Sequence, residues 1–408
     1  MHIIQKTISG IKTIFLPMES STTITTQIFC HAGSIYETKE TNGLSHFLEH
    51  MFFKGGKKYP TSEVLNKLLD GIGAEFNAYT SDYFASYYVK SSPEYRATGL
   101  DVLADMICHA TLPVEEIEKE KDVILQELQM YKDQPRQWML MNAKKRYQWD
   151  NAYGRPILGS EDTIKAVNQE SLIAHKSALY TKDNLIIVVA GKLINQEAIE
   201  TTLEQEFAHL RTKSNLQKTL YTWYKPSELQ SQLVQWVHQS HVICFAEGIS
   251  LKDEEACKAS KILANALWWT CSARLYSELR EKLWLCYYVG AWHSANNDFW
   301  QFQMYAGLDK DKLQLGLDKM MEICKSIAHE SITQDEFQLA KSNYIGMLQM
   351  WLESSDELSD RAGSRYMMQG DILPLEEIIQ QYQAVTYDQV RDLSSLLSPN
   401  RIYTYSIV

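Results

Sequence analysis

The chain has 408 residues, which is more than one ordinary hydrophobic core accommodates and enough for two or three domains of typical size. Hydrophobic residues make up 45% of it and charged residues 22%, close to the averages of soluble globular proteins, so collagen-like, disordered and low-complexity classes are excluded. The formal net charge of -11 has the wrong sign for a protein that neutralises phosphates over a broad surface, and nucleic acid is therefore not the expected partner.

The cysteines and the first residues indicate a compartment. The seven cysteines are scattered and include no CxxC pair, so they predict neither a disulfide framework nor a thiolate metal site. Residues 1–17 lack the basic, apolar and small-residue regions of a signal peptide. The sequence has no uninterrupted apolar stretch of about 18 residues that could cross a bilayer. We therefore expect a soluble, cytoplasmic protein without a membrane partner.

Strands and helices alternate in the first half of the sequence. In chain order, the predicted elements are strands at 13–16 and 22–31, a helix at 42–53, a helix that starts at 60–62 and ends before Gly71, paired strands at 74–80 and 83–90, helices within 93–147, a helix at 162–179 and a strand at 185–190. This mixture predicts a unit in which helices cover a sheet.

The second half repeats this order after a polar stretch. Residues 211–232 lack helical or strand periodicity, and we interpret them as a linker. The elements predicted after it are a strand at 233–245, helices at 253–267 and 272–282, strands at 286–292 and 299–307, and a long helical region. Internal duplication explains the repeated order. The sequence thus predicts an α+β fold with two similar domains, 1–210 and 233–408, each a mainly antiparallel sheet covered by helices.

A pair of histidines carries the first chemical signal. His46 and His50 are four residues apart, so on a helix both imidazoles lie on one face and can reach a single ion. Glu49 borders the same face, where its carboxylate could accept a proton from metal-bound water. This HxxEH order matches the inverzincin pattern. A helix with a solvated histidine and glutamate would give the same letters, so the interpretation needs a third ligand.

The third ligand is sought downstream, because catalytic zinc ordinarily has three protein ligands and keeps its fourth position for water. The predicted helix 113–130 presents Glu120 and Glu127, which are two helical turns apart on one face. Either could complete the site. Acidic residues are also normal partners of the macrodipole at a helix start, as the glutamates within 115–118 illustrate. The spacing alone does not choose between the two.

The ten residues that begin at His46 read HFLEHMFFKG, and 76 residues separate His50 from Glu127. This sequence and spacing resemble the pitrilysin or insulinase family of zinc peptidases, and most of all its short branch of mitochondrial processing peptidases. The resemblance implies one zinc ion per chain, bound by His46, His50 and Glu127. It also implies that Glu49 activates water and that Glu120 has an auxiliary role beside the ligands. By this resemblance, 1–210 is the metal-binding catalytic domain.

The stretch 73–81 is similar to the substrate strand of that family, with its Asn77-Ala78 pair. The resemblance implies that a peptide adds to the sheet edge there. Ladder hydrogen bonds would then hold the main chain of the peptide, which suits unrelated sequences that are extended and unfolded. Without the resemblance, Asn77 fits an ordinary strand-end or turn residue.

In the second half, the stretch 272–287 resembles the arginine and tyrosine motif of the family, and Arg280 and Tyr287 match the pair. In the family this pair comes from the non-metal half and faces the zinc site across a closed chamber. Its donors would bind the substrate carbonyl and the oxyanion that develops during water attack. Without the resemblance, Arg280 fits an ordinary solvent-exposed charge on a helix, and Tyr287 fits an ordinary aromatic residue of a strand.

Three tryptophans depart from the family pattern. Trp268 and Trp269 occupy the place of a glycine-rich turn before the arginine helix, and Trp284 replaces a glycine before the tyrosine. We expect these bulky side chains to reshape the chamber wall and to affect peptide specificity.

Taken together, the sequence and the resemblance predict a zinc-dependent endopeptidase that hydrolyses short or unfolded peptides within a closed chamber. One chain offers one metal half and one arginine-tyrosine half, so a full chamber would need two copies, and we expect a homodimer. The alternative is a peptide-binding or partner subunit of the same fold, with weak activity, in a hetero-oligomer. The intact metal and base residues favour the enzyme.

Overall fold

The computed structural model describes residues 2–147, 151–214, 229–234, 237–298, 300–350 and 353–408. The chain forms two compact units. Unit 1 comprises Met1–Gln129, Asp150–Leu220 and Trp351–Pro374, and unit 2 comprises Met130–Trp149, Tyr221–Met350 and Leu375–Val408. Each unit has one sheet packed with helices, so the predicted α+β class is confirmed. Residues 215–228 of the predicted linker lie outside the described residues, and the boundaries at 210 and 233 stay a prediction.

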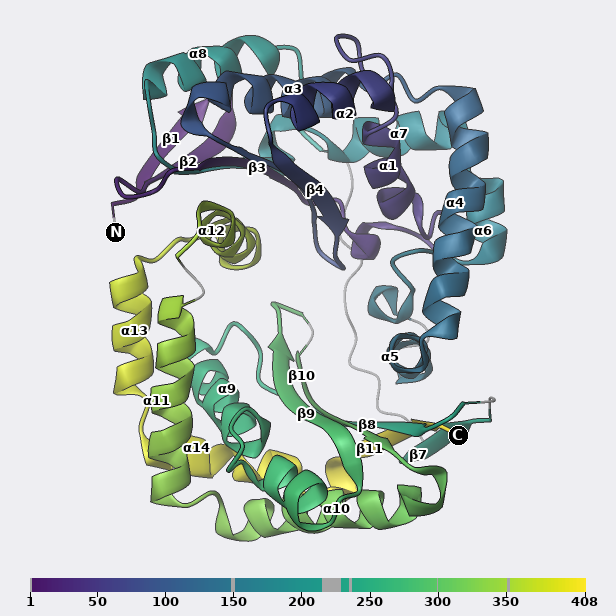
Figure 1. The fold of residues 1–408 in the computed structure, drawn as a ribbon, viewed down its shortest axis with the longest axis vertical. Helices are drawn as coiled ribbons and strands as arrows, with labels where there is room; N and C mark the ends of the chain where they lie inside the picture. The colour runs from purple at the N-terminus through teal and green to yellow at the C-terminus, as the bar shows by residue number, and fades with distance from the viewer. Residues whose placement is uncertain (1, 148–150, 215–228, 235–236, 299, 351–352) are drawn as a thin grey trace. The chain divides into compact units, whose positions relative to one another are not determined.

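The sheet of unit 1 has six strands in the order β1-β2-β6-β3-β5-β4. Its strands are β1 (Ile4–Ile8), β2 (Ile11–Pro17), β3 (Ile24–Cys30), β4 (Glu75–Thr80), β5 (Ala85–Ser91) and β6 (Leu185–Gly191). All neighbours pair antiparallel except β2 and β6. Every residue of β3 and β6 is buried, because helices cover both faces of the sheet (Figure 1). Strand β1 was not predicted, and its middle residues are exposed at the sheet edge.

Seven of the described α-helices of unit 1 precede the predicted linker: α1 (Leu44–Phe52), α2 (Ser62–Gly71), α3 (Arg96–His109), α4 (Val114–Asp133), α6 (Glu161–Ala166), α7 (Gln169–Leu179) and α8 (Gln196–Glu206). Of these, α3 packs on β3 and β5 and α1 packs on β4 and β5, on one face of the sheet. The predicted helix 162–179 is divided into α6 and α7, because the side chain of Asn168 accepts a hydrogen bond from the Ser171 N–H and caps a new helix.

Helix α12 (Ser355–Gln369) covers the other face of the sheet, although it belongs to the last sixth of the sequence (Figure 1). The Ser355 hydroxyl is hydrogen-bonded to that of Thr25 on β3, at 2.8 Å. Gly363 faces Phe29 so closely that a Cβ atom there would lie 2.0 Å from the ring. The absence of a side chain at Gly363 therefore lets α12 approach β3.

The sheet of unit 2 has five strands in the order β7-β11-β8-β10-β9, and only β7 and β11 pair in parallel. Its strands are β7 (Gln230–Leu233), β8 (Ser240–Glu247), β9 (Cys286–Ala295), β10 (Trp300–Leu308) and β11 (Tyr403–Ile407). The single strand predicted at 233–245 is wrong in extent, because β7 ends at Leu233 and β8 begins at Ser240.

The helices of unit 2 include one from the first half of the sequence. They are α5 (Pro135–Tyr147), α9 (Glu254–Trp268), α10 (Leu313–Glu330), α11 (Gln334–Met350), α13 (Leu375–Ala384) and α14 (Tyr387–Leu393). Helix α5 packs on β8 and β11, and its Met139 and Tyr147 belong to the hydrophobic core there. The predicted helix 272–282 contains a π-helix, η5 (Tyr276–Lys282). None of the described helices is long and apolar enough to traverse a bilayer.

Candidate metal centre

The first part of the site is helix α1, which carries the HxxEH motif. Eight of its nine residues are buried, including His46 and Glu49, which are only 7% and 9% exposed. Its apolar residues pack into unit 1 and hold the helix, so the two histidines stand at fixed positions one turn apart. The sequence-based prediction of a helix at 42–53 thus places the motif correctly.

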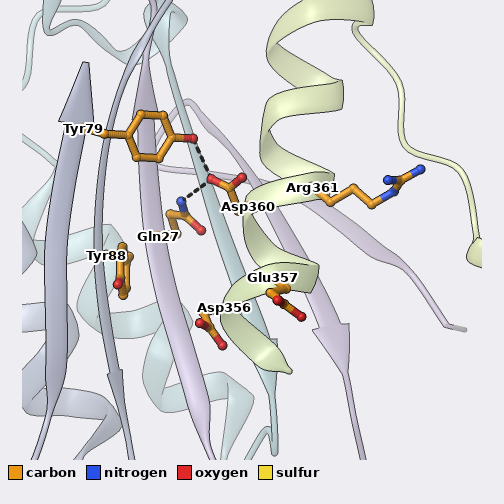
Figure 2. A pocket seen from close by; sticks show the side chains of 7 residues that line it. All are labelled: Gln27, Tyr79, Tyr88, Asp356, Glu357, Asp360 and Arg361. Atoms are coloured by element: carbon orange, nitrogen blue, oxygen red, sulfur yellow. Dashed lines mark hydrogen bonds between the residues drawn. The ribbon is translucent and has the colours of Figure 1, made fainter. Parts of the chain in front are cut away.

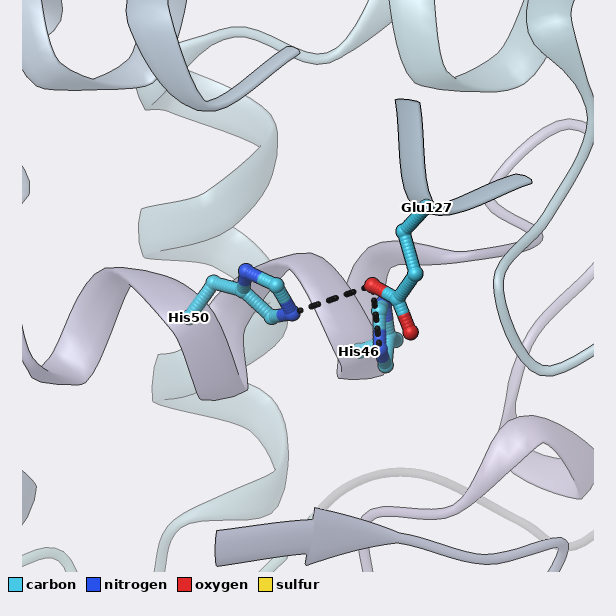
Figure 3. A group of neighbouring side chains, drawn as sticks. All are labelled: His46, His50 and Glu127. Atoms are coloured by element: carbon cyan, nitrogen blue, oxygen red, sulfur yellow. Dashed lines mark ion pairs between the residues drawn. The ribbon is translucent and has the colours of Figure 1, made fainter. Parts of the chain in front are cut away.

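The second part is Glu127 on α4, which points at both imidazoles (Figure 3). Its Oε2 atom lies 3.6 Å from His46 Nε2 and 3.5 Å from His50 Nε2. One ligand atom from each of the three residues lies within 4.8 Å of the others. A tetrahedral zinc ion with bonds of about 2.0–2.2 Å separates its ligand atoms by about 3.4 Å, so this donor set fits zinc.

Glu120 contacts the ring nitrogen of His50 that does not face Glu127. Its Oε1 lies 2.8 Å from His50 Nδ1, and its Oε2 lies 2.6 Å from Lys54 Nζ. The side chain is only 3% exposed. Of the two glutamates that the spacing left open, Glu127 therefore faces both imidazoles, whereas Glu120 faces the far nitrogen of His50. Lys54 was not singled out from the sequence, although it lies one turn after His50.

Burial and charge give the two histidines opposite protonation. Burial, together with the neighbouring His50, lowers the pKa of His46 to about 4, so this imidazole is neutral at pH 7. Burial also acts to lower the pKa of His50, but hydrogen bonds with Glu120 and Glu127 outweigh it and raise the pKa to about 9. His50 is therefore protonated at pH 7. A divalent cation that binds His50 would displace one proton, because imidazole binds a metal in its neutral form.

The pKa values of the Glu127 and Glu49 carboxyl groups are also shifted in opposite directions. Burial acts to raise the pKa of Glu127, but the hydrogen bond with His50 and the charges of both histidines leave it lowered. At Glu49 burial dominates and raises the pKa, while the Thr80 hydroxyl, which donates to its Oε2, acts against that rise. Thr80 ends strand β4, and sequence reasoning did not find its contact because it joins residues of two separate elements.

Strand β4 is the edge of the sheet next to the site, and among the described strands it pairs only with β5. Asn77 is exposed on it, and its Oδ1 accepts a hydrogen bond from the Ala78 N–H at 2.9 Å. The Tyr79 hydroxyl donates to Asp360 of α12 at 2.5 Å, and Gln27 Nε2 donates to the same carboxylate at 3.0 Å. The Tyr79 hydroxyl therefore connects the edge strand β4 to α12.

A cavity of about 400 Å³ lies between this sheet and α12 (Figure 2). The residues that line it are Gln27, Tyr79, Tyr88, Asp356, Glu357, Asp360 and Arg361. Asp360 lines it from the helix and accepts hydrogen bonds from two other lining residues, Gln27 of β3 and Tyr79 of β4.

The predicted arginine and tyrosine pair lies within unit 2. The Arg280 guanidinium carbon is 4.7 Å from the ring centroid of Tyr287 and 4.9 Å from that of Tyr276. Tyr287 is 78% exposed. Trp284 has a φ of 52°, in the left-handed region that favours glycine, which explains the glycine expected at this position. The structure thus brings the pair together, and its role stays a prediction.

The fold and the site define a class: a two-domain α+β protein in which an inverzincin motif on a buried helix and a glutamate of α4 form a group that could hold a metal ion. Comparisons with known proteins agree. Residues 14–161 match the family model of insulinase (Peptidase family M16), and residues 166–344 match that of the peptidase M16 inactive domain.

Two relatives cover almost the whole chain. It is 31% identical over 373 residues to the uncharacterized zinc protease YmxG of Bacillus subtilis, with 91% of this chain and 89% of the relative covered. It is 30% identical over 390 residues to an uncharacterized zinc protease of Rickettsia felis, with 95% and 92% covered. The chain therefore belongs to the M16 peptidase family, the insulinase family that the motif predicted.

Solved structures show the same fold. A protease from Helicobacter pylori superposes with a TM-score of 0.89 at 20% identity, covering 100% of this chain and 99% of that one. A putative M16-like peptidase from Alicyclobacillus acidocaldarius gives a TM-score of 0.87 at 18% identity, with 100% and 98% covered. The family and the names of the relatives support a peptidase with zinc.

Proposed function

We propose that the protein is a zinc-dependent endopeptidase that hydrolyses short or unfolded peptides. One observation carries the proposal: two imidazoles and one carboxylate converge on one point, with all three ligand atoms within 4.8 Å of one another. Such a set leaves a fourth position for water, as catalytic zinc sites do. The protonation of two of the three residues also supports it, because a neutral His46 and an ionised Glu127 can bind a cation directly, whereas at His50 the cation would displace a proton.

Glu49 is the general base in this proposal. When bound, zinc would polarise the scissile carbonyl and lower the pKa of its water. Glu49 follows His46 by three residues on the same helix, and burial raises the pKa of its carboxyl, which makes the carboxylate a better proton acceptor. It would take the proton of the attacking water and deliver it to the leaving amine. The Thr80 hydroxyl would orient it, because it donates to Oε2.

The substrate is proposed to add as a strand to β4. The strand is at the sheet edge, and the Asn77-Ala78 pair lies in it. Main-chain hydrogen bonds would hold an extended peptide there, whatever its sequence. Arg280 and Tyr287 would supply donors to the substrate carbonyl and to the oxyanion, from the second half of a closed chamber.

We further propose that the protein acts in the cytoplasm and that two copies form the working chamber. The motifs support the two-copy chamber, because each chain has one metal half and one arginine-tyrosine half. Gel filtration coupled to light scattering measures the mass in solution. We expect a dimer, and a monomer with full activity would contradict the proposal.

The purified chain alone tests the activity itself. A library of quenched peptides is incubated with the chain, with and without a zinc chelator, and cleavage sites are identified by mass spectrometry. The proposal predicts internal cleavage that the chelator abolishes and added zinc restores. Binding of the peptides without any cleavage would instead support the alternative, a partner subunit that holds peptides for another chain.

A further inference from the structure

The two imidazoles of the site are held in different ways. His50 has its second ring nitrogen hydrogen-bonded to Glu120 at 2.8 Å. His46, in contrast, has a buried Nδ1 atom that finds no hydrogen-bond partner in the part of the chain that the structure describes. No second contact of that kind orients its ring. Apart from its packing against the His50 ring, 4.6 Å away between centroids, the His46 ring is therefore directed by the backbone of α1 where this residue is attached, in the first turn of the helix.

That first turn is capped by a residue from outside the helix. A helix start leaves backbone N–H groups without partners, and a Ser, Thr, Asp or Asn at the N-cap usually accepts from them. The N-cap of α1 is Gly43, with a φ of 99° and no side chain for this task. Glu37 takes its place: Oε2 accepts from the Gly43 N–H at 2.9 Å, and Oε1 accepts from the Ser45 N–H at 2.8 Å.

Glu37 is itself fixed by its surroundings. It is 1% exposed, and its Oε2 also accepts from the Asn42 side-chain amide at 3.0 Å. The same amide donates to the carbonyl of Pro156 at 2.9 Å, and the Arg155 guanidinium donates to the backbone carbonyl of Glu37. The carboxylate therefore ties the start of α1 to the segment around 155–156. Its negative charge also suits the positive end of the helix macrodipole.

We propose that Glu37 is a positioning residue of the metal centre: its buried carboxylate holds the first turn of α1 and thereby directs the His46 ring at the ion. The inference rests on the proposed function, because His46 needs a direction only if it is a ligand. It extends that function to a residue that touches neither metal ligand nor substrate. Loss of the carboxylate is expected to weaken zinc binding while all three ligands remain.

The test compares Glu37→Gln with Thr61→Ala. Glutamine keeps the shape of the side chain, but its NH₂ group would face an N–H donor in place of one oxygen. Thr61 is the matched control, because its side chain caps α2 by accepting from the Val64 N–H, and α2 holds no proposed ligand. Burial raises the pKa of Glu37 to about 7, against the hydrogen bonds it accepts, so the comparison is made above that pH.

The first readout is the zinc dissociation constant of each folded variant, measured by competition with a chelating dye. We expect Glu37→Gln to weaken zinc binding about tenfold or more, the scale known for residues that orient ligands, and Thr61→Ala to change it less than about twofold. Equal losses in both variants would overturn the proposal, because a general loss of helix stability would act alike on both. If the wild-type chain takes up no zinc, the proposed function itself has failed.

The second readout needs neither metal nor activity. Amide hydrogen exchange of the metal-free wild-type chain reports whether the Ser45 N–H is protected by its bond to Glu37. We expect slow exchange in the wild type and fast exchange in Glu37→Gln. Fast exchange at Ser45 in the wild type would overturn the proposal even if the variant does not fold.

Discussion

Glu120 Oε1 lies 2.8 Å from His50 Nδ1, and this contact fixes which nitrogen of His50 faces Glu127. The remaining oxygen of Glu120 is 2.6 Å from Lys54 Nζ, so the carboxylate is held between two cationic partners. Carboxylates that accept from the far nitrogen of a ligand histidine set its tautomer and raise its basicity. The auxiliary role expected for Glu120 thus has a geometric basis.

Replacing Glu120 by Gln should weaken zinc binding without removing it. The amide cannot supply the negative charge that supports His50, so we expect the dissociation constant for zinc to rise by about 10- to 100-fold. Chelator competition measures it, and Glu118→Gln, on the same helix but largely exposed, is the control. An unchanged affinity in Glu120→Gln would show that Glu120 has no part in the site.

Replacing Asp360 by Asn should affect substrate binding more than turnover. Asp360 accepts from Tyr79 on β4 and from Gln27 on β3, so it holds the strand proposed to receive the peptide. We expect KM to rise several-fold while kcat stays close to the wild-type value. Glu357→Gln is the control, because it lines the same cavity and is exposed. A fall in kcat with unchanged KM would contradict this role.

Replacing Gly363 by Ala should destabilise unit 1. A Cβ atom at this position would lie 2.0 Å from Phe29, and overpacking of a tight contact costs about 1–3 kcal/mol. Urea unfolding measures the loss. Gly346→Ala is the control, because nothing lies within 4 Å of its added Cβ and alanine favours a helix. Equal stability of the two variants would mean that α12 does not pack on β3 as described.

Acid should weaken unit 2 through His293. Burial, and then Lys261, lower the pKa of His293 from 6.5 to about 3, and its Nε2 accepts from the Ile249 N–H at 2.9 Å, which requires a neutral ring. The unfolded chain binds this proton more tightly, so the stabilisation is complete above pH 6.5 and is lost as pH falls toward 3.

We therefore expect the free energy of unfolding to fall by about 1–2 kcal/mol more in the wild type than in His293→Asn between pH 7 and pH 5. Urea titrations at several pH values measure how the free energy of unfolding of each protein depends on pH. The same pH dependence in both proteins would show that His293 is not buried as a neutral ring.

The convergence of His46, His50 and Glu127 was predictable because local rules govern most of it. The i, i+4 spacing placed His46 and His50 on one helix face, and the resemblance selected Glu127 where spacing left Glu120 equally open. Contacts between distant elements carry no such periodic signal. The Thr80 contact with Glu49 and the Asp360 contact with β4 were missed for this reason.

The fold class was predictable, but the packing of two helices was not. Periodicity indicates that α5 and α12 are helices, yet it does not say which sheet covers their apolar faces. In the structure α12 packs on β3 and β6, and α5 packs on β8 and β11. The close approach of Gly363 to Phe29 becomes a signal only once the partner strand is known.

In the proposed mechanism, His46, His50 and Glu127 bind a catalytic zinc ion and Glu49 accepts and delivers the proton. The most direct measurement determines, in the same preparations, the zinc content and the rate of peptide hydrolysis of wild type, Glu49→Gln and Glu127→Ala. We expect one zinc per chain in wild type and Glu49→Gln, hydrolysis in wild type alone, and neither zinc nor hydrolysis in Glu127→Ala. Normal hydrolysis by Glu49→Gln, or full zinc content in Glu127→Ala, would contradict it.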